Sequence, residues 1–249
     1  MQQRHAKLPT MVIYEKNCAG MKRYIIGITL SGLLLFVLLQ GASLFREAEQ
    51  KAVLLEKIRQ SPGLVPKFTH ADLRDGDIVF HQSLSAQSEA IQLATHAVYT
   101  HCGIIYKMGN GYFVFEAVEP VKLTPLAEWM GRGKGGDYKV KRLKTADTVF
   151  TDALVQKMKK LGEQYSGRHY DPFFEWSDDR MYCPELVWKL YKELTGLELG
   201  RLQELKDFDL TNQAVQKKLE ERFGKKIPMH QPVISPVSIY ESPLLKTVE

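Results

Sequence analysis

The chain has 249 residues, 44% of them hydrophobic and 25% charged, with a formal net charge of +5. This length and composition suit one catalytic domain with a sizeable core. Residues 1–23 carry five basic side chains against one acidic side chain, so most of the excess charge is local and a nucleic-acid partner is not expected. Three cysteines, Cys18, Cys102 and Cys183, exclude a framework of disulfide bonds.

An uncharged and mostly apolar run from Tyr24 to Phe45 is long enough to cross a bilayer as a helix. Lys22 and Arg23 precede it, which predicts a cytoplasmic N-terminus and an exported remainder. The run is also typical of a signal peptide, with small residues at 41–43 as a cleavage zone. We expect a domain of the cell envelope, anchored in the membrane and exported to the periplasmic or extracellular side, or secreted if the segment is cleaved. The predicted parts are a basic stub (1–23), an anchor or signal (24–45), a helical linker (46–70) and a hydrolase domain (71–249).

The segment Asp75–Phe80 predicts a turn into a strand, and Ser85–Thr95 predicts an amphipathic helix. Residues 98–118 predict a hairpin, because β-branched and aromatic runs flank a turn sequence. The two-residue loop is either 109–110 or 110–111. In both registers Glu116 lies on the same face as His101, whereas a longer loop or a bulge would reverse this.

Glu116 is the one polar side chain between Tyr112 and Val118. A carboxylate in such a strand is either buried with a partner, preferably a cation, or lines a pocket. The alternatives are a solvated Glu116 and a purely structural His101.

Further elements follow along the chain. Lys134–Lys144 reads as a mobile basic loop that enters a strand. The order of elements predicts an α+β fold with a small antiparallel sheet packed with helices. The other predicted segments are a short helix (124–130), a longer helix (147–165), a charged surface helix (211–223) and an extended, proline-punctuated tail (228–243).

The segment Met181–Trp188 places Cys183 at the start of a helix with an apolar stripe. Pro184 suits the first helical position, which predicts Cys183 as the N-cap. Free amides and the helix dipole there stabilise a thiolate and lower a cysteine pKa. The alternative is a buried, unreactive cysteine.

These motifs together resemble the YiiX/YebB-like cysteine hydrolases, which are circularly permuted papain-like proteins of the NlpC superfamily. The resemblance runs from about Leu73 to the C-terminus. It implies that Cys183 is the nucleophile, His101 the base and Glu116 the orienting residue. It rests on the segments 95–103, 115–122, 170–171, 176–180 and 182–185.

Two residues depart from the family pattern. Pro184 stands where a serine is common, and Cys102 directly follows the histidine where a non-thiol residue is commoner. Strand alternation predicts that Cys102 points away from the His101 face into the core. A disulfide between Cys102 and Cys183, which would silence the enzyme, is the alternative.

The leading hypothesis is a thiol-dependent hydrolase that cleaves an amide bond, in a peptide or cell-wall peptide, through an acyl-enzyme on Cys183. The alternative is a lipid-directed esterase or acyltransferase with the same triad, acting on an acyl-lipid. No cofactor is expected. Tyr170, Trp176 and Tyr182 are candidates for the pocket wall, or else core aromatics.

Two rivals belong to other classes. The first is a non-catalytic binding module on the same scaffold. The second is a metal-binding module, although the spacing of its candidate ligands matches no compact zinc pattern. Those ligands are His81, His96, His101, Cys102 and Cys183.

Overall fold

The computed structural model describes residues 73–248. The predicted stub (1–23), anchor or signal (24–45) and linker (46–70) lie outside these residues, as does Cys18, and stay predictions. Within residues 73–248, no helix is both long and apolar enough to cross a membrane.

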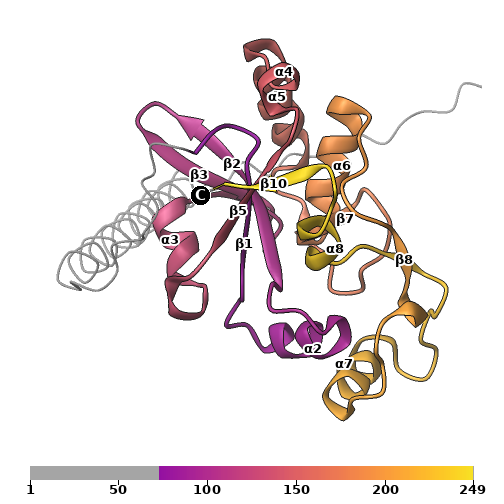
Figure 1. Cartoon of the computed structure of the whole chain (residues 1–249). Coiled ribbons are helices and arrows are strands. Elements are labelled where there is room, and N and C mark those ends of the chain that lie inside the picture. Colours follow the sequence, from indigo (N-terminus) through magenta and orange to yellow (C-terminus); the bar gives the residue numbers. More distant parts are fainter. Residues whose placement is uncertain (1–72, 249) are drawn as a thin grey trace, which may run out of the picture. The chain divides into compact units, whose positions relative to one another are not determined.

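A six-stranded sheet in the order β10-β5-β1-β2-β3-β4 forms the centre of the domain (Figure 1). Every neighbouring pair is antiparallel, which confirms the predicted antiparallel sheet. Two short ladders lie apart from it, β6 (His169–Tyr170) with β7 (Arg180–Met181), and β8 (Gln203–Glu204) with β9 (Pro232–Val233). The main strands are β1 (Ile78–His81), β2 (His101–Met108), β3 (Gly111–Glu116), β4 (Lys122–Pro125), β5 (Lys139–Leu143) and β10 (Leu245–Thr247).

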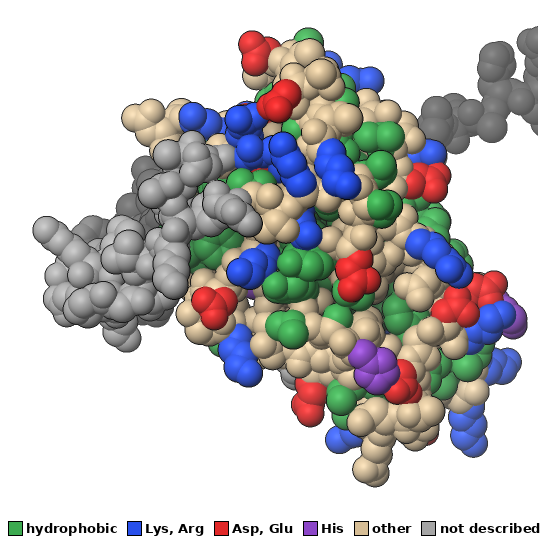
Figure 2. Space-filling view, in the orientation of Figure 1, with side chains coloured by type: hydrophobic (Ala, Val, Ile, Leu, Met, Phe, Trp, Pro, Cys, Tyr) green, Lys and Arg blue, Asp and Glu red, His purple; other side chains and the backbone are tan. Residues whose placement is uncertain are grey.

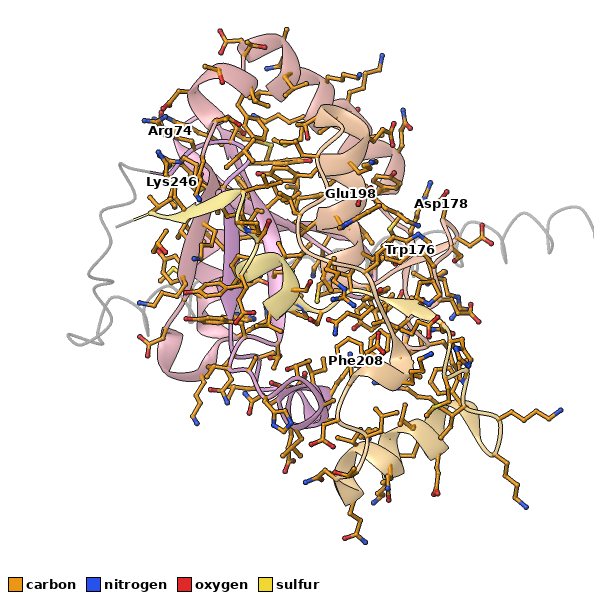
Figure 3. All side chains as sticks on the ribbon, turned by 45° about the vertical axis from the view of Figure 1, so that its right-hand side comes forward. Arg74, Trp176, Asp178, Glu198, Phe208 and Lys246 are labelled. Carbon is orange, nitrogen blue, oxygen red and sulfur yellow. The ribbon has the colours of Figure 1, made fainter. Side chains whose placement is uncertain are left out.

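Alternate residues of the strands enter two cores, one on each face of the sheet. Val79 and Ile105 pack with α3 (Leu126–Gly131) on one face. Phe80 and Ile104 pack on the other face with α5 (Asp152–Tyr165), α6 (Cys183–Thr195) and α8 (Pro236–Tyr240). Side chains fill the space between these layers (Figure 3). The helices α2 (Ala86–Thr95) and α7 (Gln213–Phe223) pack against each other beyond the strand ends (Figure 1).

The hairpin of β2 and β3 adopts one of the two predicted registers. Met108 opposes Gly111, so the loop is Gly109–Asn110. Gly109 has a φ of 56°, a left-handed conformation that favours glycine. The pairing runs without a bulge from this loop to Phe115, so Glu116 lies on the predicted face of the sheet.

Two predicted helices begin or break at other residues. Thr124 belongs to β4, where it opposes Val114, so the short helix begins only at Leu126. The long helix is interrupted after α4 (Ala146–Val149), because Thr151 caps a new helix by accepting a hydrogen bond from the Leu154 amide at 3.3 Å. Both differences come from local pairing or capping that periodicity does not reveal.

The C-terminal elements also differ from prediction. The tail is not wholly extended, because Ser235 caps α8 and Pro236 occupies its first turn, with Ile239 fully buried. The helix α7 begins at Gln213 after the cap Asn212. The basic loop forms a 3-10 turn, Lys134–Gly136, before it enters β5 as predicted.

Candidate active site

Cys183 is the first residue of α6 and not its N-cap, so the helix begins one residue earlier than predicted. Tyr182 is the N-cap, because its carbonyl accepts the Leu186 amide at 3.1 Å while its own amide donates to Glu185 Oε2 at 3.2 Å. Pro184 therefore occupies the second helical position. Cys183 still lies in the first turn, at the positive end of the helix.

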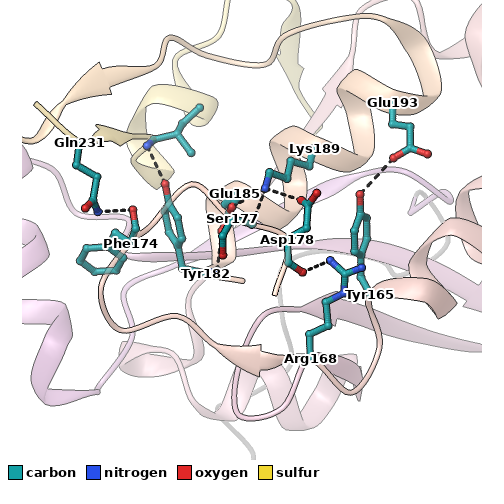
Figure 4. A network of polar contacts seen from close by, with 11 residues as sticks. Tyr165, Arg168, Phe174, Ser177, Asp178, Tyr182, Glu185, Lys189, Glu193 and Gln231 are labelled. Carbon is teal, nitrogen blue, oxygen red and sulfur yellow. Dashed lines mark hydrogen bonds and ion pairs between the residues drawn. The ribbon is translucent and has the colours of Figure 1, made fainter. Parts of the chain in front are cut away.

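Polar contacts fix the segment that leads into Cys183 (Figure 4). Lys189 Nζ binds the Ser177 carbonyl at 2.6 Å and Asp178 Oδ1 at 2.8 Å. Lys189 also forms an ion pair with Glu185 inside α6 at 2.8 Å. On the other side, the Tyr182 hydroxyl accepts the Ile234 amide at 3.1 Å. The start of α6 is thus held by both the preceding loop and the C-terminal segment.

His101 and Glu116 share a face and contact each other as predicted, with His101 Nε2 2.6 Å from Glu116 Oε2. Residue 103 on the same face must be glycine, because neighbouring atoms fill the space there: an added Cβ would lie 2.4 Å from a Val114 methyl group and 3.3 Å from the Cβ of Glu116. Glu116 is fully buried. Its other oxygen accepts hydrogen bonds from Thr124 Oγ1 at 2.6 Å and from Arg132.

The charges of this cluster support one another. Burial opposes the ionised Glu116, but His101 and Arg132 outweigh it and lower its pKa to about 2. Burial also opposes the imidazolium, but Cys183 and Glu116 raise the pKa of His101 to about 9. At Cys183, burial is outweighed by hydrogen bonds from Cys102 and by the charge of His101, which lower its pKa well below the ordinary value. Both shifts favour a thiolate at Cys183 paired with an imidazolium at His101.

His81, on β1, lies directly opposite His101 on β2. Its ring stacks on Trp129 at 4.0 Å between centroids and lies 5.2 Å from the His101 ring. Burial, and then the positive charge of His101, lower the pKa of His81 to about 3. The residue beside the imidazolium therefore stays neutral.

Sequence reasoning missed two residues of this site and named a third, His81, only as a candidate metal ligand. A cation for Glu116 was expected, but nothing in the sequence marks Arg132, which follows α3 and lies 16 positions from Glu116. Thr124 was placed in a helix, and no pattern links it to Glu116. The place of His81 beside His101 follows only from the register of β1 against β2.

Cys183 lies where two cavities meet. A cleft of about 810 Å³ contains His101, Arg132, Tyr170 and Cys183 in its wall. A second cavity, of about 90 Å³ and almost wholly apolar, extends from Cys183 between α2 and α7. We call it the apolar pocket; its wall includes Ala94, Phe174, Tyr182, Phe208, Leu210, Val215 and Leu219.

The predicted pocket aromatics take different places. Tyr170 lines both cavities, and Tyr182 lines the apolar pocket. Trp176 lines neither of these two cavities and packs edge-on against Trp188 at 5.2 Å. Phe208, which sequence reasoning did not select, lines the apolar pocket (Figure 3).

The predicted metal ligands are not arranged as a metal site, although His81, His101, Cys102 and Cys183 lie near one another. No group of three or more His, Cys, Asp or Glu side chains within residues 73–248 is arranged to hold a metal ion. His96 ends α2 and pairs with Asp209 at 3.0 Å, outside the two cavities.

Hydrophobic side chains occur in small groups among charged ones on the face drawn in Figure 2. The two most exposed large hydrophobic side chains among residues 73–248 flank α2 in the sequence, Leu84 with 68% and Val98 with 59% of their surface accessible. Leu84 also lines the cleft. The wall of the cleft therefore includes one highly exposed apolar side chain.

Comparisons with known proteins agree on one family. A family described as "Permuted papain-like amidase enzyme, YaeF/YiiX, C92 family" matches residues 72–249. The uncharacterized protein YiiX of Escherichia coli strain K12 is 46% identical over 173 residues, which cover 70% of this chain and 84% of that protein. The crystal structure of "metalloprotein yiiX from Escherichia coli O157:H7, DUF1105" is similar with a TM-score of 0.67 and 45% identity, covering 71% of this chain and 96% of that one.

Proposed function

The chain belongs to the YaeF/YiiX family of permuted papain-like amidases, and on that premise we propose that it is a cysteine hydrolase with Cys183 as its nucleophile. The observation that carries the proposal is the series Cys183, His101, Glu116, in which Cys183 and His101 line the large cleft and the buried Glu116 binds His101. The thiolate attacks a carbonyl carbon, and the His101 imidazolium protonates the leaving group. Water activated by the neutral imidazole then hydrolyses the acyl-enzyme.

The tetrahedral intermediate needs donors for its oxyanion. The first is the start of α6, including the Cys183 amide. The second is the hydroxyl of Tyr170. Arg222 binds the amide oxygen of Gln87 at 2.7 Å, so the amide nitrogen donates to the Tyr170 oxygen at 2.9 Å and the Tyr170 hydrogen points to another acceptor. Tyr170 lines the cleft together with Cys183, which suits it to donate to the oxyanion.

We place amide hydrolysis first, because the family is one of amidases. The apolar pocket beside Cys183 favours a second candidate, hydrolysis or transfer of an acyl group with an apolar chain. The two candidate functions differ in which part of the substrate occupies the apolar pocket.

The related E. coli structure is described as that of a metalloprotein. The residues of this chain do not fit a metal at the site, since no group of three or more His, Cys, Asp or Glu side chains among residues 73–248 is arranged to hold one. His101 Nε2 is engaged with Glu116, and the charge of Cys183 is balanced by His101. No step of the proposed mechanism passes through a metal.

The test is alkylation of Cys183 by chloroacetamide between about pH 4 and 9, with the modified residue mapped by mass spectrometry. We expect rapid labelling that persists below about pH 7, because the thiolate is already formed. The substitution His101→Ala should abolish this, since it removes the imidazolium. The exposed His96 provides the matched control, and His96→Ala should label as the wild type does.

Labelling with the pH profile of an ordinary thiol would contradict the proposal. A non-catalytic binding module would then be favoured. Catalytic activity that persists in the variant Cys183→Ala would also contradict the proposal.

A further inference from the structure

A second thiol lies beside the nucleophile, on the far side from the imidazole. Cys102 follows His101 on β2 and points into the opposite core, as strand alternation predicted. That core is covered by α6, and Cys183 is the first residue of α6. The helix α6 packs directly on β2, and hydrogen bonding by the thiol and the backbone amide of Cys102 lowers the pKa of Cys183. Both cysteines are reduced.

The two thiols differ in ionisation and in access. Burial raises the pKa of Cys102, and Cys183 raises it further, so Cys102 keeps its proton. Cys102 is completely inaccessible and lines neither of the two cavities described above, whereas Cys183 lines both. A small oxidant that enters the cleft therefore meets a thiolate first and finds a thiol directly behind it.

We propose that Cys183 is a site of reversible oxidation by hydrogen peroxide or an alkyl hydroperoxide, with Cys102 as the thiol that resolves it into a disulfide. The Cys183 thiolate attacks the terminal peroxide oxygen, the O–O bond breaks, and water or an alcohol leaves after taking a proton. Cys183 is then a sulfenic acid. Cys102 loses its proton and attacks the Cys183 sulfur, the S–O bond breaks, and the leaving hydroxide takes up that proton to form water. In sum, two thiols are oxidised and one hydroperoxide is reduced.

This reaction protects the nucleophile. A sulfenic acid without a neighbouring thiol proceeds to sulfinic acid, which thiol reductants do not reverse. A disulfide between Cys102 and Cys183 stops turnover but returns both thiols on reduction. The inference rests on the reactive thiolate of the proposed function, not on any particular substrate.

The experiment treats the reduced full-length chain with one equivalent of hydrogen peroxide, blocks remaining thiols and digests with trypsin without reduction. Cys102 and Cys183 fall in separate tryptic peptides, residues 75–107 and 181–189, and Cys18 falls in residues 17–22. We expect the first two peptides to be joined, with the loss of two hydrogens. Dithiothreitol should separate them and restore rapid alkylation of Cys183.

The variant Cys102→Ala tests the role of the second thiol directly. Its Cys183 should be trapped by dimedone as a sulfenic acid and, with more peroxide, should lose alkylation in a way that dithiothreitol does not reverse. Peptide mapping of the wild type decides the matter even if this variant does not fold. A wild-type Cys183 that alkylates rapidly but accumulates as sulfenic or sulfinic acid, or joins only the Cys18 peptide, overturns this inference alone. A Cys183 that alkylates like an ordinary thiol overturns the proposed function as well.

Discussion

Glu116 occupies an environment that few carboxylates tolerate, since it is fully buried within the sheet. It is stable there because donors on three separate elements reach it, namely His101 on β2, Thr124 on β4 and Arg132 after α3. The carboxylate therefore stays ionised at any physiological pH. Its charge orients the His101 ring and helps to keep that ring protonated while Cys183 is a thiolate.

The hydroxyl of Tyr170 provides a prediction at the same scale. Tyr170→Phe removes one oxyanion donor and keeps the ring in the cleft wall, so kcat should fall about 10²-fold. The alkylation rate of Cys183 should change little, because the imidazolium is retained. Steady-state kinetics alongside alkylation checks both expectations, and a variant with unchanged kcat would remove Tyr170 from the mechanism. The half-buried Tyr112 on β3 lines neither of the two cavities, and Tyr112→Phe serves as the control.

The helix α6 connects the hydrophobic core to the candidate nucleophile, Cys183. Its inner face contributes Leu186 and Leu190, both completely buried, and it ends at Gly196, whose φ of 75° is left-handed. Burial of this face holds the helix start, and hence Cys183, against β2. The same burial encloses Glu185 in the first turn, where its carboxylate is paired with Lys189.

Glu185 makes the stability of the fold depend on pH. Burial, only partly offset by Lys189, raises its pKa from 4.5 to about 7. A carboxyl group with a raised folded pKa contributes stability that is fully present below its unfolded pKa and is lost as the pH rises through about 7.

The substitution Glu185→Gln should remove this dependence. Between about pH 4.5 and 8, the free energy of unfolding of the wild type should fall by on the order of 2 kcal/mol more than that of the variant. Urea unfolding at several pH values measures the difference. The exposed Glu220→Gln on α7 should behave as the wild type. Parallel pH profiles for wild type and Glu185→Gln would show that Glu185 does not titrate in this range.

At the scale of the molecule, two layers of different character meet at Cys183. The sheet and α3 build the polar side, with His81, His101, Glu116 and Arg132. The pair α2 and α7 closes the apolar pocket on the other side. Tyr170 borders both cavities, so a substrate that reaches Cys183 is bounded by polar groups on one side and apolar groups on the other.

Filling the apolar pocket separates the two candidate functions. Ala94 on α2 lines it, and Ala94→Phe reduces its volume. If an acyl chain occupies the pocket, kcat/KM for long-chain esters should fall about tenfold or more, while short-chain esters are unaffected. The control is Ala153→Phe on the exposed side of α5. Equal effects on long and short chains would count against an acyl chain in the pocket.

The sequence by itself determined the antiparallel hairpin, its Gly109–Asn110 loop as one of two registers, and the shared face of His101 and Glu116, because turn chemistry and the two-residue strand period are local properties. It also placed Cys183 in the first turn of a buried helix. Contacts between distant segments were beyond its reach. Arg132 and Thr124 reach Glu116, His81 opposes His101, and Cys102 touches Cys183 because separate strands and helices pack together. The apolar pocket likewise exists only where α7 packs on α2, about 120 residues later in the chain than α2.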